Sequence, residues 1–302
     1  MSSSEAYHQF CSENRVSLFL QKSWMDGSGF ECRFVEKKIH GYNGYFIYPM
    51  QKRFGLRFLR NPHFTPYTGI VFGNQVPPVS QHSEWLTAYL SHAPVYDVMD
   101  LSFPIELQPD SAITLKMAIQ KRPTCLLTLT TASEVYQRFN DTLKRQIRKS
   151  QTHVIEDSQD MNLFYQLHTK TFSVQNLRNP IPSSAYHRYW ELAQRLACTR
   201  LFQMRDQEGH ILGMCWLVFD QQKAYYLAGT RNAEMAGSEV MARLLWHAIQ
   251  FAISSGIAYF DFEGSDHAGI HRFFKTFSPV ETSYLQLKDQ RSLWYRILKG
   301  RN

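Results

Sequence analysis

The feature that most constrains the fold is the segment 240–256, which reads VMARLLWHAIQFAISSG. Ser238 suits the N-cap position, Glu239 complements the helix dipole, and Gly256 suits the residue just after the last turn. Apolar side chains surround this helix almost completely, so it must lie in the interior of the molecule. The chain must therefore surround one helix with other elements.

Strand-like segments on either side of this helix indicate what surrounds it. Residues 211–219 and 224–229 flank a polar turn and predict a hairpin, and residues 257–262 predict a buried strand. Hairpin strands pair antiparallel, whereas a helix between two strands implies a crossover to a parallel neighbour. Further strands are predicted at 152–157, 201–205 and 281–288, and helices at 158–172 and 184–197. The pattern predicts a mixed sheet with helices on both faces.

The first half shows strand-like runs at 30–38 and 42–50 and a long helix at 133–150. A chain of 302 residues is long for a single core. We therefore predict an α+β (mixed α/β) protein of two domains, residues 1–150 and 151–302. Each is expected to hold a mixed, mostly antiparallel sheet flanked by helices.

Composition bounds the possible partners and the compartment. The net charge of +7 favours an anionic partner such as nucleic acid, a nucleotide-linked substrate, CoA or a membrane surface, or simply describes a soluble basic protein. Five cysteines without a CxxC pair argue against a disulfide framework and a structural zinc site. No signal peptide or run of about 20 apolar residues is present, so a cytoplasmic location is expected.

Two carboxylates in the sequence FDFEGS are the first candidates for chemistry. In a strand, alternate side chains share a face, which predicts that Asp261 and Glu263 lie together at the carboxyl end of an apolar strand. One of them could orient an acceptor amine or take its proton. The alternative is a structural pair that caps the loop through the amides of Gly264 and Ser265.

Lys275 is the second candidate, because it stands within the aromatic run FFKTF. A lysine in such surroundings needs an acidic partner or a route to solvent. It could stabilise an oxyanion or hold a phosphate, or it could be an ordinary surface lysine. His267 and His271 are spaced for one helical face, but no third ligand is evident, so no metal site is predicted.

Basic residues form a third group of candidates. One helical face is predicted to carry Lys144, Arg145, Arg148 and Lys149. It could meet the phosphates of a nucleotide-sugar or a tRNA, or it could simply face solvent. Arg57 could bind an anion in the first domain. No motif that reads nucleic-acid bases accompanies either group.

The segments FDFEGS, GI and FFKTF, at 260–265, 269–270 and 273–277, resemble the signature of the FemAB-like branch of the GNAT acyltransferase superfamily. The segments 143–150, 168–172 and 224–229 are similar as well. The resemblance covers residues 120–288. It implies two GNAT-like domains and transfer of an acyl or aminoacyl group onto an amine, with Lys275 matching a lysine that faces the reaction centre.

The same resemblance leaves the donor open. Members that build peptidoglycan cross-bridges take amino acids from charged tRNA and often carry a long helical arm, for which this chain has no room. GNAT domains that use CoA place an (R/Q)-x-x-G-x-(G/A) loop before the central helix to cradle the pyrophosphate. Residues 230–238 read TRNAEMAGS instead, although Arg231 and the helix N-terminus at Ser238 still offer an anion site.

We therefore expect an N-acyltransferase or aminoacyltransferase without a certain cofactor. Its co-substrate would be an acyl-CoA or an aminoacyl-tRNA. The acceptor would be a small-molecule or nucleotide-linked amine, such as a cell-envelope precursor. The alternative is a non-catalytic protein on a decayed GNAT fold that recognises an anionic ligand or RNA.

Overall fold

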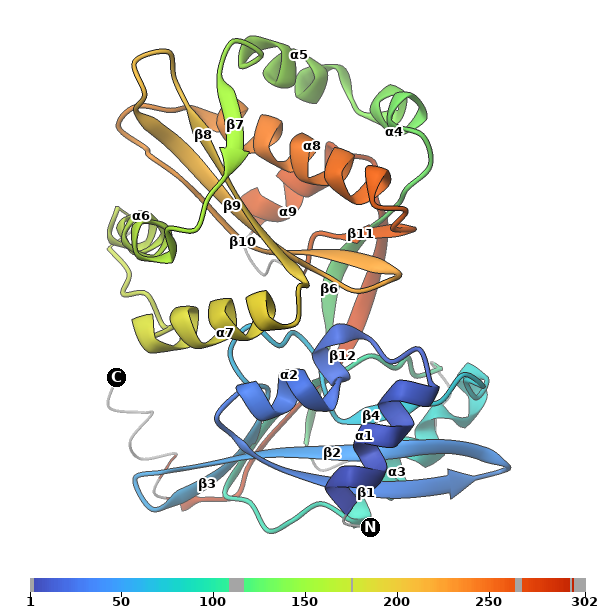
Figure 1. Cartoon of the computed structure of the whole chain (residues 1–302). Coiled ribbons are helices and arrows are strands. Elements are labelled where there is room, and N and C mark those ends of the chain that lie inside the picture. The colour runs from blue at the N-terminus through green and yellow to red at the C-terminus, as the bar shows by residue number, and fades with distance from the viewer. Residues whose placement is uncertain (1–2, 109–116, 175, 264–267, 294, 296–302) are drawn as a thin grey trace. The chain divides into compact units, whose positions relative to one another are not determined.

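The computed structural model describes residues 3–108, 117–174, 176–263, 268–293 and 295. Its chain divides into two compact units (Figure 1). The first unit comprises Met1–Pro123 and Ser283–Asn302, and the second comprises Thr124–Thr282. None of the helices in the described ranges is long and apolar enough to cross a bilayer.

The first unit is built on a five-strand path within the sheet, β1-β2-β3-β5-β12, with β4 paired to β2. Pairing is antiparallel except between β3 and β5. The strands are β1 (Glu31–Ile39), β2 (Tyr42–Arg53), β3 (Leu56–Arg60), β4 (Ile70–Phe72), β5 (Val98–Phe103) and β12 (Val280–Gln290), of which residues 280–282 belong to the second unit. The helical elements are α1 (Ser3–Glu13), η1 (Leu18–Leu20), α2 (Lys22–Gly27), η2 (Val79–Gln81) and α3 (His82–Ser91).

The second unit follows the order β6-β11-β10-β9-β8-β7, with one parallel pair, β10 and β11. Its strands are β6 (Ala118–Thr128), of which residues 118–123 belong to the first unit, β7 (Val154–Asp157), β8 (Thr199–Arg205), β9 (Ile211–Phe219), β10 (Lys223–Arg231) and β11 (Tyr259–Asp261). Its helices are α4 (Ala132–Arg138), α5 (Asp141–Lys149), α6 (Met161–Ser173), α7 (Ser183–Arg195), α8 (Ser238–Ser254) and α9 (Ala268–Lys275). The predicted fold class, a mixed and mostly antiparallel sheet flanked by helices, is confirmed.

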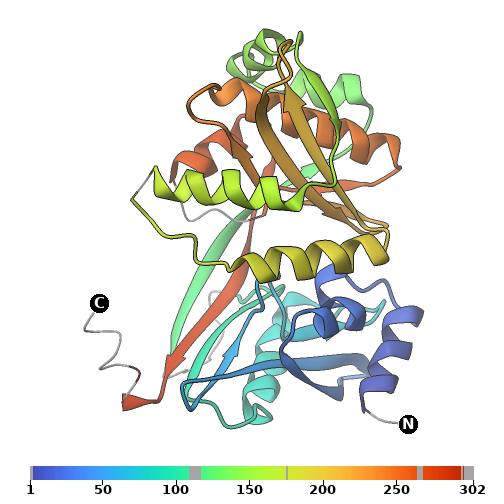
Figure 2. The same ribbon diagram turned by 60° about the vertical axis from the view of Figure 1, so that its left-hand side comes forward.

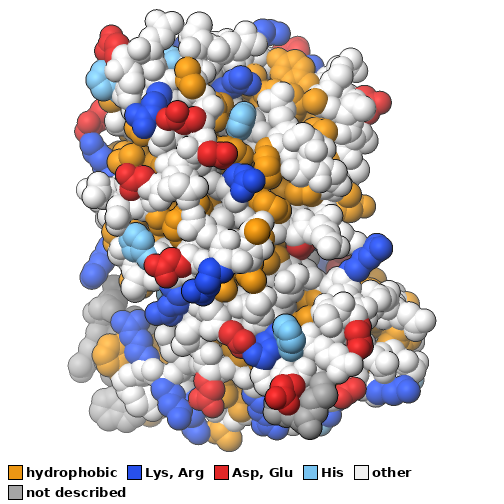
Figure 3. Space-filling model, viewed as in Figure 1, with side chains coloured by type: hydrophobic (Ala, Val, Ile, Leu, Met, Phe, Trp, Pro, Cys, Tyr) orange, Lys and Arg blue, Asp and Glu red, His pale blue; other side chains and the backbone are white. Residues whose placement is uncertain are grey.

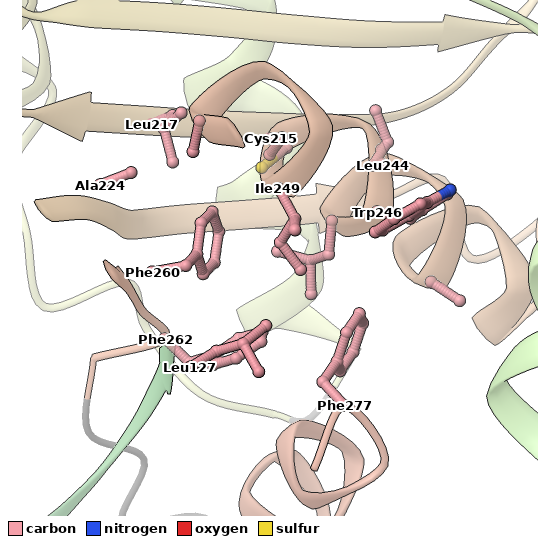
Figure 4. Close-up of a cluster of buried hydrophobic side chains, with 14 of the residues drawn as sticks. Leu127, Cys215, Leu217, Ala224, Leu244, Trp246, Ile249, Phe260, Phe262 and Phe277 are labelled. Atoms are coloured by element: carbon pink, nitrogen blue, oxygen red, sulfur yellow. The ribbon is translucent and has the colours of Figure 1, made fainter. Parts of the chain in front are cut away.

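Successive side chains of β9 point to opposite faces of this sheet, and helices pack on both faces. Cys215 and Leu217 point into the core that contains α8 (Figure 4). Trp216, between them, points to the other face, where it contacts Tyr186 and Trp190 of α7. Figure 2 shows α6 and α7 running along that face. The sheet is therefore sandwiched, as the crossover argument predicted.

The helix α8 is the most deeply buried helix segment of this core. Eight of its residues are buried, among them Leu244, Leu245 and Ile249. It approaches β9 closely at Gly213, where a Cβ would lie 2.7 Å from Val240 Cγ1 and 2.9 Å from the carbonyl oxygen of Thr230. A side chain at position 213 would therefore push the helix off the sheet.

The structure departs from the sequence prediction in the segment 133–150. Two helices replace the one long helix, because Phe139 is extended and Asn140 caps the second helix through the backbone N–H of Leu143. Leu143 and Ile147 of α5 then join the core around α8. For this reason residues 124–150 belong to the second compact unit, and the predicted domain boundary at residue 150 lies inside that unit.

Neighbouring residues of β11 provide a test of this packing. Phe260 is fully buried in the core, whereas Tyr259 is 37% exposed. Because truncation of a buried phenylalanine leaves a cavity, Phe260→Ala should lower the free energy of unfolding by about 3–5 kcal/mol. Tyr259→Ala is the matched control and should cost less than about 1 kcal/mol. Urea unfolding measures both, and equal losses would contradict the described burial.

Candidate functional site

The candidate site lies where the parallel strands β10 and β11 part. Their last paired residues are Tyr225 and Asp261. The strand β11 ends there, whereas β10 continues to Arg231 and stays paired with β9 on its other side. The backbone groups of β10 that face β11 are thus released from that ladder beyond Tyr225. Carboxyl ends of parallel strands are where open α/β sheets place their ligands.

Asp261 holds the end of β11. Its side chain is 2% exposed, and its Oδ1 accepts hydrogen bonds from Thr124 Oγ1 (2.7 Å) and from the backbone N–H of Glu263 (2.9 Å). Phe260, its neighbour, points into the core, so Asp261 points to the opposite face of the sheet. Asp261 therefore caps the turn through the amide of Glu263, whereas the predicted capping was through the amides of Gly264 and Ser265. Gly264 and Ser265 lie outside the described residues.

Glu263 leaves the strand in a backbone conformation that only glycine adopts without cost. Its φ is +57°, and the strand has already ended at Asp261. The period-two rule therefore does not decide where its half-buried side chain points, and the predicted shared face does not follow from the strand. A left-handed φ costs a non-glycine residue about 1–2 kcal/mol, and such strain concentrates at functional loops.

Lys275 sits at the end of α9 within a chain of polar contacts. Its Nζ lies 2.6 Å from Glu281 Oε1. The other carboxylate oxygen of Glu281 lies 3.4 Å from His271 Nε2, and His271 Nδ1 lies 3.9 Å from the sulfur of Cys125. Lys275 and Glu281 are both about half exposed, whereas Cys125 is fully buried. The predicted acidic partner of Lys275 is therefore Glu281.

Electrostatics assign charges within this cluster. The pKa of the Glu281 carboxyl is lowered, chiefly by its hydrogen bond with Lys275, so Glu281 is ionised at neutral pH. Burial and the negative charges of Glu281 and Asp261 raise the pKa of the Cys125 thiol to about 11. Cys125 is therefore a neutral thiol at pH 7 and a poor nucleophile.

Of the three residues predicted to be catalytic, Asp261 ends β11, Glu263 follows it on the adjoining turn, and Lys275 ends α9. Both Asp261 and Lys275 are near enough to Cys125 to act on its ionisation. Cys125 belongs to the core that holds α8, and Phe274 places α9 on the same side. Asp261 stands on the opposite face of the sheet. Asp261 and Lys275 would therefore have to approach a substrate at the end of β11 from opposite faces of the sheet.

Three of the predicted ligand-binding residues meet at the N-terminus of α8. Gly237, not the predicted Ser238, is the N-cap residue. Ser238 Oγ instead accepts a hydrogen bond from Gln146 Nε2 of α5 at 2.9 Å. Lys149 Nζ lies 3.1 Å from Glu239 Oε1, and the Arg231 guanidinium donates to the carbonyl oxygen of Ala236.

The other predicted basic residues lie apart from this group. Lys144 Nζ donates to the carbonyl oxygen of Gln137 at 2.8 Å, and the side chain of Arg148 is exposed. Arg57 belongs to the first unit and pairs with Asp97 through Nε at 3.3 Å. On the face shown in Figure 3, acidic and basic side chains are interspersed, with no broad area of one sign. That face does not resemble a nucleic-acid surface.

Sequence reasoning missed a partly buried polar network between α6 and α7. Asn179 Nδ2 donates to the hydroxyl of Tyr186 (3.2 Å) and to Oγ1 of Thr169 (3.1 Å). Tyr186 lies 2.7 Å from His168 Nδ1. Burial lowers the pKa of His168 to about 4, so its imidazole is neutral at pH 7. In the sequence, only the motif HTKTF at 168–172 pointed to polar residues of interest in this region.

One group in the described ranges has the spacing of metal ligands. Asp206, Glu208 and His210 stand on the turn between β8 and β9, where Glu208 is exposed. The Asp206 carboxylate already accepts the backbone N–H groups of Glu208 (3.0 Å) and His210 (2.8 Å). The group is thus explained as a turn motif. Of the two histidines considered for metal binding, His267 lies outside the described residues.

Comparison with known proteins finds one family model and several similar folds. Residues 137–275 match the family model described as acetyltransferase (GNAT) domain. The chain is similar to FemX over 98% of both chains, with 13% sequence identity and a TM-score of 0.69. It is also similar to the C-terminal DUF2156 domain of a provisionally named lysylphosphatidylglycerol synthetase from Agrobacterium fabrum (12% identity, 94% and 91% of the two chains, TM-score 0.55). L-PGS from Bacillus licheniformis gives 12% identity over 97% and 94%, with a TM-score of 0.54.

No curated protein matches the sequence. The central segment of the chain, 137–275, nevertheless matches the model of a GNAT domain, and the whole chain has a fold similar to that of FemX. The resemblance to the FemAB-like branch of the GNAT superfamily is thereby confirmed.

The buried His168 predicts a pH dependence of stability. Its folded pKa of about 4 lies below the unfolded value of about 6.5, so the unfolded chain binds the proton more readily. The contribution of neutral His168 to the free energy of unfolding is fully present above pH 6.5 and is lost as the pH falls toward 4. The loss should be about 1.4 kcal/mol per pH unit, and roughly 3 kcal/mol in total.

The control is His168→Asn, which keeps a hydrogen-bonding group beside the Tyr186 hydroxyl but cannot take a proton in this range. Thermal unfolding of both proteins between pH 7.5 and roughly pH 4.5 isolates His168 from the other histidines. The wild-type curve should fall more steeply below pH 6.5. Parallel curves would show that His168 is not buried in its neutral form.

Proposed function

We propose that the protein is an N-acyltransferase that moves an acyl or aminoacyl group onto an amine. The observation that carries the proposal is the parting of β10 and β11 at Tyr225 and Asp261, within the segment that matches the GNAT domain. The released edge of β10 offers backbone N–H and C=O groups to an extended donor. Asp261 supplies a carboxylate at the point where the strands part.

The chemistry needs no covalent enzyme intermediate. The amine nitrogen attacks the donor carbonyl carbon, and the new C–N bond forms as the bond from carbon to the thioester sulfur or ester oxygen breaks. The amine loses one proton, and the leaving sulfur or oxygen takes one. The neutral thiol of Cys125 agrees with direct transfer. Proximity and fixed electrostatics can supply most of the rate.

Residue roles follow from what each side chain touches. Asp261 is proposed to orient the amine or accept its proton, since its charge is buried at the strand end. Glu263, on the adjoining turn, is the second candidate for that proton. Lys275 is proposed to stabilise negative charge that develops on the donor, with Glu281 holding its position. The acceptor is proposed to be a small-molecule or nucleotide-linked amine, such as a cell-envelope precursor.

A non-catalytic role is the second candidate, because Asp261 and Lys275 both have structural partners that explain their presence. In that case the protein would bind an anionic ligand and leave it unchanged. The test of Asp261 separates the two candidates.

Asp261→Asn keeps an oxygen for the hydrogen bonds from Thr124 and Glu263 but removes the charge. We expect kcat/KM to fall by roughly 10²–10⁴-fold, the usual contribution of a general base, with little change in Tm. The assay follows product amide by mass spectrometry, with acyl-CoA thioesters and charged tRNA as donors and a set of amines as acceptors.

The control is Thr124→Val, which removes the hydroxyl that contacts Asp261 and keeps the carboxylate charge. It should lower stability by about 1 kcal/mol and retain most activity. If Asp261→Asn kept full activity, Asp261 would have only the structural role of capping the turn after β11. If Lys275→Ala folded and kept full activity, the proposed role of Lys275 in the reaction would be wrong. No transfer with any donor would favour the non-catalytic candidate.

A further inference from the structure

A carboxylate of the chain itself occupies the N-terminus of α8. Glu239 is the second residue of this helix, and its side chain is 20% exposed. The carboxylate folds back over the N-cap, since a Cβ added to Gly237 would collide with it. Helix N-termini attract anions through their unpaired N–H groups and the helix dipole. Here the anion is the carboxylate of Glu239, a residue of the helix itself.

The carboxylate is held by the same kinds of group that hold a phosphate. The pKa of Glu239 is lowered first by a hydrogen bond from its own backbone N–H, and then by Lys149 and the charge of Arg231. The Lys149 Nζ lies 3.1 Å from Oε1. A backbone amide, two cations and a helix terminus together resemble an anion site that already has its anion.

The backbone N–H groups of the loop before α8 are likewise already bonded within the chain. The backbone N–H groups of Met235 and Ala236 both donate to the carbonyl oxygen of Asn232, at 3.1 and 2.9 Å. The N–H of Glu234 donates to Asn232 Oδ1 at 3.3 Å. A loop that cradles a phosphate must point such amides at the ligand. Asn232 takes three of them instead.

We propose that Glu239 is a donor-specificity residue, which keeps the phosphate groups of a donor out of the N-terminus of α8. This inference rests on the proposed acyl transfer and narrows its donor. A donor that enters along the β10 edge must place its phosphates elsewhere or carry none near the acyl group. A second anion at the helix terminus would meet the Glu239 charge at close range, which is strongly unfavourable in a partly buried site.

The experiment measures binding, so that its failure is distinct from a failure of catalysis. Inorganic pyrophosphate and CoA are titrated by calorimetry into wild type, Glu239→Ala and Glu234→Ala. Glu239→Ala should bind pyrophosphate on the order of tenfold more tightly than wild type, since one charge at a helix terminus is replaced by another. Glu234→Ala is the matched control, because Glu234 stands in the same loop but pairs with Lys170, and it should match wild type.

Two further variants close the test. Glu239→Gln keeps the side chain's size and removes its charge, and thermal shift with pyrophosphate reads it out if Glu239→Ala is too unstable. Lys149→Ala in the Glu239→Ala background should abolish the gain. The inference is overturned if wild type binds CoA and Glu239→Ala binds it no better, or if neither Glu239 variant gains affinity for pyrophosphate. Acyl transfer by wild type from other donors would then still support the proposed function.

Discussion

The burial of α8 is the constraint on which the second unit depends. An all-round apolar helix must be enclosed, and here the sheet covers one side while α5 and the Phe274–Phe277 region cover others. Because α8 follows β10 and leads into β11, enclosing it makes these two strands parallel neighbours. The short length of β11 then ends the pairing at Asp261. The candidate site is thus a consequence of how one helix is packed.

That packing also sets the chemistry available at the two ends of the crossover. At the end of β11, a buried carboxylate and a half-exposed lysine lie on opposite faces of the sheet. At the start of α8, a carboxylate from the chain satisfies the helix N-terminus. Both features favour a reaction that depends on positioning and fixed charge, since the one cysteine in the cluster is held as a neutral thiol.

Much of the second unit could be predicted from local pattern. The hairpin of β9 and β10, the interior helix and the strand after it all follow from hydrophobic period and turn residues. The single helix predicted at 133–150 was wrong, because the capping strength of Asn140 outweighed a continuous apolar stripe. The network of His168, Tyr186 and Asn179 could not be predicted, since its members are brought together only when α6 and α7 pack.

Residue order and hydrophobic period are enough to predict that a buried helix crosses between two strands, that carboxylates follow the second strand, and that a CoA-type glycine loop is missing. The partners of these groups depend on tertiary packing. Side-chain alternation holds only while a strand continues, so the turn at Glu263 released it from the face of Asp261. Lys275 pairs with Glu281, and Glu239 pairs with Lys149. In each pair the two residues lie on different elements, so the contact depends on how the elements pack and not on spacing along the chain.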